Sequence, residues 1–329
     1  MKNRLFSAFC GTLVLSAYFL MSGGWTSAIA AEASEKHPVR AKKQGQKQKP
    51  TRKLAQKRSP VSKSASAPQE LFVNGQMTLR STSALVLDQS NGQALLEKNA
   101  AMIVPIASIT KLMTAMVVLD AHQPLEELIQ ITEEDVDYLR GSGSRVRPGL
   151  SMTRDTALLL ALMSSENRAA NALGRHYPGG IPAFVAAMNQ KARALGLRQT
   201  HFSEPTGLSA RNVSTARDLA RMVEAAHQYP KIREYSTMTG VRLDTGTRIL
   251  SFTNTNALVK NPQWQIGLSK TGYISEAGRC LVMQAWVAGR PVVMVLLDAQ
   301  GKMTRVGDAN RIKRWIEANP SRLSAAVGA

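Results

Sequence analysis

The sequence predicts an α+β fold: an antiparallel sheet formed by both ends of the chain, with helices packed on it and a helical lobe inserted between its halves. Two observations support this prediction. Pairs of apolar segments joined by turn residues occur near both ends of the region 69–329, whereas helical periodicity dominates the middle. No internal repeat is apparent. The sheet must therefore pair segments that are far apart in the sequence.

The predicted strands form two hairpins. Residues 83–87 and 93–96 flank the turn sequence Ser-Asn-Gly at 90–92, which favours positive φ. Near the other end, the apolar runs 280–288 and 291–297 are joined around a Gly-Arg pair. The helices expected between and after these hairpins cover about residues 109–121, 153–162, 168–176, 181–195, 215–227 and 305–318.

Residues 1–30 have the three-part pattern of a secretory signal peptide. Two basic residues precede an apolar run at 5–21, and small residues end at Ala30, where we expect cleavage. An uncleaved membrane anchor is the alternative, which the short apolar run makes less favourable. Cys10 lies inside the apolar run and is expected to leave with the signal. We therefore expect an exported, periplasmic protein.

Residues 31–68 predict a basic disordered linker. Eleven Lys and Arg residues face two Glu residues there, a net charge of +9 out of +19 for the whole chain. The segment has too few apolar residues to offset the entropy cost of ordering. Because the chain is expected to be exported, nucleic acid is not the expected partner. Weak contact with an anionic cell envelope and a solvated spacer without a partner are both open alternatives.

The remaining region, 69–329, is about 260 residues long and can form one domain or two interleaved lobes. Its single cysteine, Cys280, cannot form an internal disulfide. Its place in a strand-like run favours a buried apolar role. The five histidines, at 37, 122, 176, 201 and 227, form no short ligand pair, so we expect no metal and no cofactor. His201 and Arg279 are open candidates for the surroundings of a cleft.

Three polar islands interrupt the apolar sequence and suggest acyl transfer through a serine ester. The first is Ser108-x-x-Lys111, where an extended approach through Pro105 favours a helix starting at Ser108. Three residues on, Lys111 returns to the same helix face, within reach of the hydroxyl. The apolar helix that follows would desolvate the amine and favour the neutral form that accepts a proton. A serine helix cap with a surface lysine is the ordinary structural alternative.

The other two islands are weak signals when taken alone. Ser165 and Asn167 follow the apolar run 157–163, where a Ser or Asn helix cap is the simplest interpretation. Lys270-Thr271-Gly272 leads into the last hairpin, so a strand edge could present an amine and a hydroxyl to a carboxylate. Gly272 would allow another backbone to approach closely.

Together, in this order and in an exported chain, the islands resemble the serine-type D-alanyl-D-alanine peptidases of the low-molecular-mass penicillin-binding proteins. The resemblance is greatest to their D-alanyl-D-alanine endopeptidases, which have a beta-lactamase/transpeptidase-like fold. It covers about residues 84–297, and the segments 105–114, 164–170, 202–208 and 270–273 carry it.

The resemblance implies a role for each catalytic group. Ser108 would be the acylated nucleophile, Lys111 its general base and Ser165 a proton relay to the leaving amine. The backbone N–H groups of Ser108 and Tyr273 would form the oxyanion hole.

The resemblance also implies the groups that bind substrate. Asn167 would hold the substrate amide, and Lys270 and Thr271 its carboxylate, beside Gly272 and Tyr273. The implied partners are peptidoglycan stem peptides, with β-lactams as covalent inhibitors that acylate the same serine, and the implied role is in cell wall biogenesis and cell shape.

Three alternatives to the endopeptidase remain open. The first is a D-alanyl-D-alanine carboxypeptidase; many of these continue into a β-rich domain and an anchor, whereas fewer than sixty residues follow Gly272 here. The second is a class A beta-lactamase, for which Glu204-Pro205 would have to supply the deacylating glutamate. The third is a non-catalytic wall-binding protein that has kept the fold.

Overall fold

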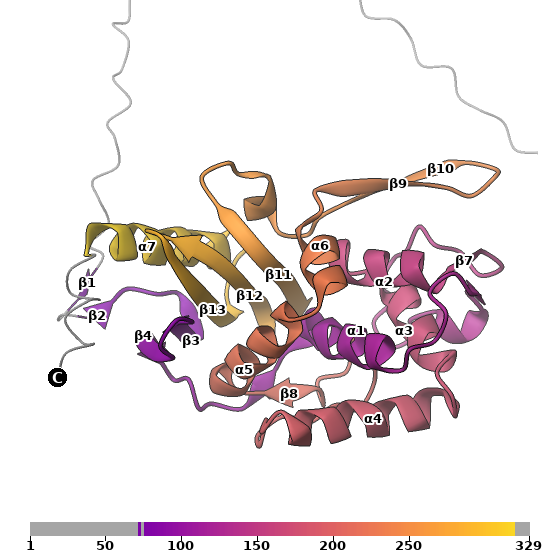
Figure 1. Cartoon of the computed structure of the whole chain (residues 1–329), viewed down its shortest axis with the longest axis horizontal. Helices are drawn as coiled ribbons and strands as arrows, with labels where there is room; N and C mark the ends of the chain where they lie inside the picture. Colours follow the sequence, from indigo (N-terminus) through magenta and orange to yellow (C-terminus); the bar gives the residue numbers. More distant parts are fainter. Residues whose placement is uncertain (1–71, 74–75, 320–329) are drawn as a thin grey trace, which may run out of the picture. The chain divides into compact units, whose positions relative to one another are not determined.

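A computed structural model describes residues 72–73 and 76–319 (Figure 1). These residues belong to one unit of the chain, Ala65–Ala329. The predicted signal peptide at 1–30 and the predicted basic linker at 31–68 lie outside the described residues. In the part that is described, no helix is both long enough and apolar enough to cross a bilayer.

A five-stranded antiparallel sheet joins the two ends of the described chain, as the sequence predicts. Its strand order is β11-β12-β13-β3-β4, so a late strand, β13, pairs with the early strand β3, with Val295 opposite Leu85. The strands are β3 (Ser81–Asp88), β4 (Gln93–Lys98), β11 (Gln265–Ile274), β12 (Gly278–Val287) and β13 (Arg290–Ala299). The α+β prediction is confirmed, and β11 forms one edge of the sheet.

Both predicted hairpins are present, and their turns have the expected backbone. Gly92, between β3 and β4, has φ of 73°, and Ala288 and Gly289, between β12 and β13, have φ of 51° and 74°. Positive φ at the two-residue turn 288–289 matches the twist of the flanking strands, and in the four-residue connection 89–92 the positive φ falls on a glycine. Local turn chemistry therefore determined these two pairings.

Alternate side chains of the sheet pack into two separate cores. Leu85, Val293 and Val295 face the core that contains helix α5 (Ala216–His227) and the helical lobe. Val86 and Met294 point the other way, toward helix α7 (Thr304–Ala318). This alternation is the period of two that strands impose. The sheet is thus buried on both faces (Figure 1).

The inserted lobe consists of helices on the α5 side of the sheet, and α1 forms its centre. Most residues of α1 are buried, which explains why its sequence is apolar on all faces. The sequence missed α6, because it is short, polar and begins at a proline. The lobe helices are α1 (Thr110–Asp120), α2 (Arg154–Met163), α3 (Asn167–Arg175), α4 (Gly180–Ala194) and α6 (Pro230–Thr237).

Several short elements carry too few residues for a periodic signal, and the sequence did not predict them. The short strand pairs are β1 (Phe72–Val73) with β2 (Gln76–Met77), β5 (Val104–Pro105) with β8 (Val213–Ser214), β6 (Leu128–Gln130) with β7 (Ser151–Thr153), and β9 (Gly240–Asp244) with β10 (Ile249–Thr253). The single 3₁₀ turns are η1 (Ala107–Ile109), η2 (Glu133–Asp135) and η3 (Ala257–Lys260).

A buried carboxylate fastens α7 to the sheet. Asp308 accepts hydrogen bonds from the backbone N–H groups of Arg80 at 3.2 Å and Ser81 at 2.7 Å, and from the Ser81 hydroxyl at 2.6 Å. It also pairs with Arg311. Because these donors are buried or partly buried, the carboxylate satisfies groups that water cannot readily reach.

Replacing Asp308 with alanine is expected to lower the free energy of unfolding by about 3 kcal/mol, because it leaves several donors unpaired. Urea denaturation followed by circular dichroism measures the change. The matched control is Glu126→Ala at an exposed carboxylate, where a change within about 0.5 kcal/mol is expected. Equal losses in the two variants would contradict the structural role of Asp308.

Candidate active site

Ser108 lies in the 3₁₀ turn η1, directly before helix α1. The sequence placed the helix start at Ser108, but the regular helix begins at Thr110. Ala107 has φ of 48°, a left-handed conformation that is uncommon for a residue with a side chain. No side chain caps either η1 or α1, so the alternative of a serine helix cap does not apply.

The amine of Lys111 lies behind this serine and is fully buried. It donates to the Ser108 hydroxyl at 2.9 Å, to Asn167 Oδ1 at 2.7 Å and to the Thr206 carbonyl at 2.6 Å. Burial lowers the pKa of Lys111 to about 8, although the charges of Glu204 and Glu166 oppose the shift. About one tenth of the amine is therefore neutral at pH 7 and able to accept a proton.

Ser165 and Lys270 form a second serine–amine pair. Lys270 Nζ donates to Ser165 Oγ at 2.8 Å and to the Thr271 carbonyl at 3.0 Å. Burial, together with the positive charges of Lys111 and Arg305, lowers the pKa of Lys270 well below its ordinary value. The second and third islands therefore meet at this hydrogen bond.

The turn at Ser165 is strained, and the helix after it is capped by a different residue from those expected. Ser165 has φ of 61° and lies between α2 and α3. The N-cap of α3 is Glu166, whose carboxylate accepts from the Arg168 N–H at 3.4 Å. The interpretation of Ser165 or Asn167 as the cap is therefore wrong. Their side chains are free to face the cleft.

Two glycines allow other segments to lie against the peptide that carries Ser108. A Cβ atom at Gly272 would lie 3.0 Å from Ala107 Cβ, from the Ile106 oxygen and from the Ser108 nitrogen. At Gly207, where φ is 83°, it would lie 2.0 Å from the Ala107 oxygen. The close approach expected of Gly272 is therefore present, and Gly207 adds one that the sequence did not predict.

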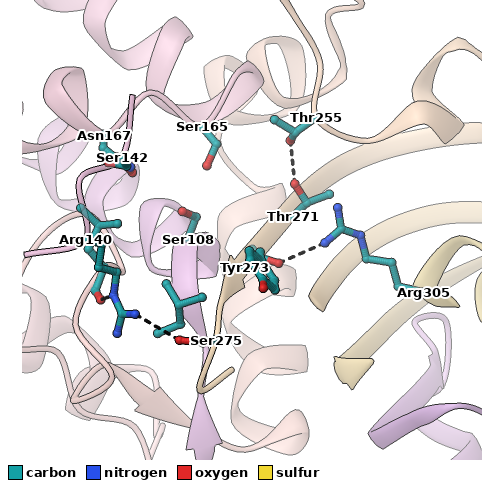
Figure 2. A pocket seen from close by; sticks show the side chains of 13 residues that line it. Ser108, Arg140, Ser142, Ser165, Asn167, Thr255, Thr271, Tyr273, Ser275 and Arg305 are labelled. Atoms are coloured by element: carbon teal, nitrogen blue, oxygen red, sulfur yellow. Dashed lines mark hydrogen bonds between the residues drawn. The ribbon is translucent and has the colours of Figure 1, made fainter. Parts of the chain in front are cut away.

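These elements enclose a cleft of about 520 Å³ (Figure 2). The hydroxyls of Ser108 and Ser165 point into the same space. Each accepts a hydrogen bond from a buried lysine, Ser108 from Lys111 and Ser165 from Lys270. The structure thus brings all eight site residues expected from the sequence into or against one cleft. Those that line it directly are Ser108, Ser165, Asn167, Thr271, Gly272 and Tyr273.

The sequence missed two residues at the end of the cleft where Thr271 lies. Thr255 accepts a hydrogen bond from the Thr271 hydroxyl at 2.7 Å. Arg305 donates to the Gly272 carbonyl at 3.0 Å and to the Cys280 carbonyl at 3.2 Å, so its guanidinium lies beside β11. A positive charge in the first turn of a helix interacts unfavourably with the helix dipole. The place of Arg305 in the first turn of α7 was therefore the one local feature of the sequence that could have marked it as functional.

Arg140 lines the opposite end of the cleft, and the sequence missed it too. Its guanidinium donates to the Leu208 carbonyl at 2.5 Å, to Ser275 Oγ at 3.4 Å and to Glu276 Oε1 at 2.8 Å. Hydrogen bonds from Arg140 and Ser275 lower the pKa of Glu276 to about 2. Two walls of the cleft are therefore linked beyond Tyr273 (Figure 2).

Glu204 braces the loop beside Lys111. Its carboxylate accepts from the backbone N–H groups of Thr206 at 2.6 Å, Gly207 at 2.7 Å and Ser209 at 3.3 Å. It also accepts from Asn212 Nδ2 at 3.0 Å. These contacts occupy both oxygens and hold the Thr206 carbonyl toward Lys111.

Three other residues considered from the sequence, His201, Arg279 and Cys280, do not line the cleft. His201 pairs through its backbone with Val213 and does not line the cleft. The guanidinium of Arg279 stacks on the Tyr273 ring, with Cζ 4.5 Å from the ring centroid. Cys280 is fully buried, and burial raises the pKa of its thiol to about 11, which is unsuited to a nucleophile.

Comparisons with known proteins match this chain to D-alanyl-D-alanine peptidases and to a penicillin-binding protein. Residues 65–301 match the family model described as D-alanyl-D-alanine carboxypeptidase. The chain is 52% identical to a D-alanyl-D-alanine endopeptidase of Pseudomonas aeruginosa over 256 residues, which covers 77% of this chain and 83% of that protein. It is 47% identical to a D-alanyl-D-alanine endopeptidase of Escherichia coli, with 74% and 79% covered. The solved structure of cefotaxime-bound penicillin-binding protein D2 from Listeria monocytogenes is similar, with a TM-score of 0.65, 28% identity and 73% and 98% covered.

Replacing Gly207 with alanine is expected to lower the free energy of unfolding by about 3 kcal/mol. The new methyl group would clash with the Ala107 carbonyl, and a residue with a side chain is strained at this positive φ. The control is Gly246→Ala, where φ is 78° but nothing lies within 4 Å of the added atom. This control is expected to lose only about 1 kcal/mol. Urea titrations measure both, and equal losses would show that the contact with Ala107 is unimportant.

Proposed function

The chain belongs to the D-alanyl-D-alanine carboxypeptidase family of serine peptidases, and from this premise we propose that it hydrolyses D-alanyl cross-links in peptidoglycan. One observation carries the proposal: the Lys111 amine lies 2.9 Å from the Ser108 hydroxyl beside an otherwise open cleft. A hydroxyl paired with a buried amine is a nucleophile with its base already in position.

In the proposed reaction, neutral Lys111 takes the proton of Ser108 as Oγ attacks the carbonyl carbon of the scissile amide. The N–H groups of Ser108 and Tyr273 stabilise the negative oxygen of the tetrahedral intermediate. Ser165, held by the hydrogen bond from Lys270 2.8 Å away, passes the proton taken by Lys111 on to the leaving amine as the amide C–N bond breaks. Water then attacks the serine ester and gives a proton to Lys111, which returns one to Ser108 Oγ as the ester C–O bond breaks.

The substrate would be held at both ends. Asn167 uses Oδ1 to accept from Lys111 and Nδ2 to donate to Ser142 at 3.1 Å, so its amide lies where it can contact a substrate amide. Thr271 and Lys270, with Arg305, offer a hydroxyl and positive charge to the free carboxylate next to the scissile bond. β-Lactams, which carry a carboxylate beside a strained amide, would acylate Ser108 and be released slowly.

The endopeptidase is preferred because two relatives that are 52% and 47% identical both carry that name. The carboxypeptidase is the second candidate, since it would use the same catalytic groups and names the family. A class A beta-lactamase is disfavoured, because the Glu204 carboxylate is occupied by N–H groups of its own loop. The two buried serine–amine pairs count against a non-catalytic binding protein.

We also propose a periplasmic location and a role in cell wall biogenesis. Peptidoglycan, the proposed substrate, lies outside the cytoplasm. The sequence pattern at 1–30 predicts export, and the basic segment at 31–68 would contact the anionic envelope weakly and in a salt-dependent manner.

Digestion of purified cross-linked muropeptides, followed by mass analysis, tests the proposed activity. We expect monomers from dimers with the native protein, and a rate reduced by at least about 10⁴-fold for Ser108→Ala. A fluorescent penicillin should label the native protein but not this variant. Loss of one terminal alanine from pentapeptides with intact dimers would indicate a carboxypeptidase, and persistent labelling of Ser108→Ala would exclude Ser108 as the nucleophile.

The pH dependence of acylation tests the role of Lys111. Because its pKa is lowered to about 8, the fraction of the amine that is neutral and able to accept a proton falls as the pH drops below that value. The acylation rate should therefore rise about tenfold per pH unit below pH 8 and level off above it. Stopped-flow labelling with a fluorescent penicillin measures the profile. Lys111→Arg, which stays protonated, should be unreactive throughout; a flat native profile from pH 6 to 9 would contradict this role.

A further inference from the structure

A second hollow, of about 500 Å³, adjoins the catalytic cleft. Thr255 lines both cavities. The cleft is also lined by Ser142 and Ser165, whereas their neighbours Gly143, Ser144, Ser164 and Glu166 line the second hollow. The two cavities therefore meet at Thr255, beside the serine that is proposed to protonate the leaving amine.

The second hollow has polar walls of both charges. Glu166 is 9% exposed as a whole residue. Both hydrogen bonds to its carboxylate, from Ser144 Oγ at 2.7 Å and from the Arg168 N–H at 3.4 Å, go to Oε1. Across the described chain, no hydrogen bond is donated to Oε2. On another wall, Arg145 donates a hydrogen bond to the Ser251 carbonyl, and its Cζ lies 5.3 Å from the centroid of the Phe252 ring. A carboxylate oxygen and a fixed guanidinium suit a chain of amides and carboxylates.

The expected course of the substrate chain also leads to the second hollow. Thr271 and Arg305 mark where the carboxylate of the leaving residue would lie, and Thr271 is bonded to Thr255. The opposite end of the cleft is lined by Arg140 and Ser275, which are hydrogen bonded to each other. A chain that continues from the leaving residue would therefore pass over Thr255.

We infer that the second hollow binds the peptide on the amine side of the scissile bond, and so favours cross-linked peptides over linear ones. This inference rests on the proposed function. A terminal D-alanine has only a methyl group to place there, whereas the leaving residue of a cross-link continues into a second stem peptide. Glu166 Oε2 accepts an amide N–H of that peptide, and Arg145 holds one of its carboxylates.

Gly143→Trp tests the inference by filling the hollow. A Cβ atom at Gly143 meets nothing within 4 Å, and its φ is not in the left-handed region. We expect the hydrolysis of a purified muropeptide dimer to fall at least about tenfold, because the remote peptide loses its binding site. The rate of acylation by a fluorescent penicillin should stay within about twofold of the native rate. The nitrogen that leaves the β-lactam carbonyl stays attached to the penicillin and carries no second peptide.

Two further variants complete the design. Thr253→Trp fills the hollow from the β10 wall and should reproduce the selective loss. Thr247→Trp adds the same bulk at the exposed turn between β9 and β10 and should leave both reactions within about twofold.

The outcomes separate the inference from the proposed function. Unchanged dimer hydrolysis in both filled variants, or an equal fall in dimer hydrolysis and penicillin acylation, would overturn the inference alone. A native protein that is acylated by penicillin but does not cleave dimers would overturn the proposed function, and the inference with it.

Discussion

The buried amine of Lys111 is the constraint on which the arrangement of the site depends. An ammonium removed from water is costly unless acceptors surround it. Its acceptors come from three distant segments: the turn at Ser108, the start of α3 at Asn167 and the loop at Thr206. The hydrogen bonds donated by the Lys111 amine therefore hold together the parts of the lobe that form the cleft. The same burial lowers the pKa of the amine and so prepares it to act as a base.

Strain at the site is held in place by close packing around it. Ala107 and Ser165 both have positive φ, which costs about 1 to 3 kcal/mol each and persists only where neighbours enforce it. Gly207 and Gly272 allow a loop and the edge strand β11 to press against the strained peptide before Ser108. The Ser165 turn is held by the hydrogen bond from Lys270. Both serines are therefore presented by backbones that the surrounding structure fixes.

The charges around the two lysines differ, and this difference suits their separate roles. Glu166 and Glu204 lie near Lys111 and partly offset its burial. Lys270 instead lies near Lys111 and Arg305, whose positive charges lower its pKa further. The Lys270 end of the cleft therefore lacks negative charge, and a substrate carboxylate would supply it. In the proposed reaction, electrostatics thus separate carboxylate binding from catalysis along one groove.

The sequence by itself determined the hairpins, most of the helices and the eight residues at the site, because turn chemistry, periodicity and short motifs are local properties. Gly92 with its turn and the apolar helix after Lys111 are examples. Only the tertiary structure decided which distant groups complete the site: Arg140, Thr255, Arg305 and the hollow beside Glu166. It also showed that Glu204 braces its own loop. These contacts join segments far apart in the chain, so no local pattern specifies the partners, although the place of Arg305 in the first turn of α7 is a local signal. The contacts exist only once the two cores bring the segments together.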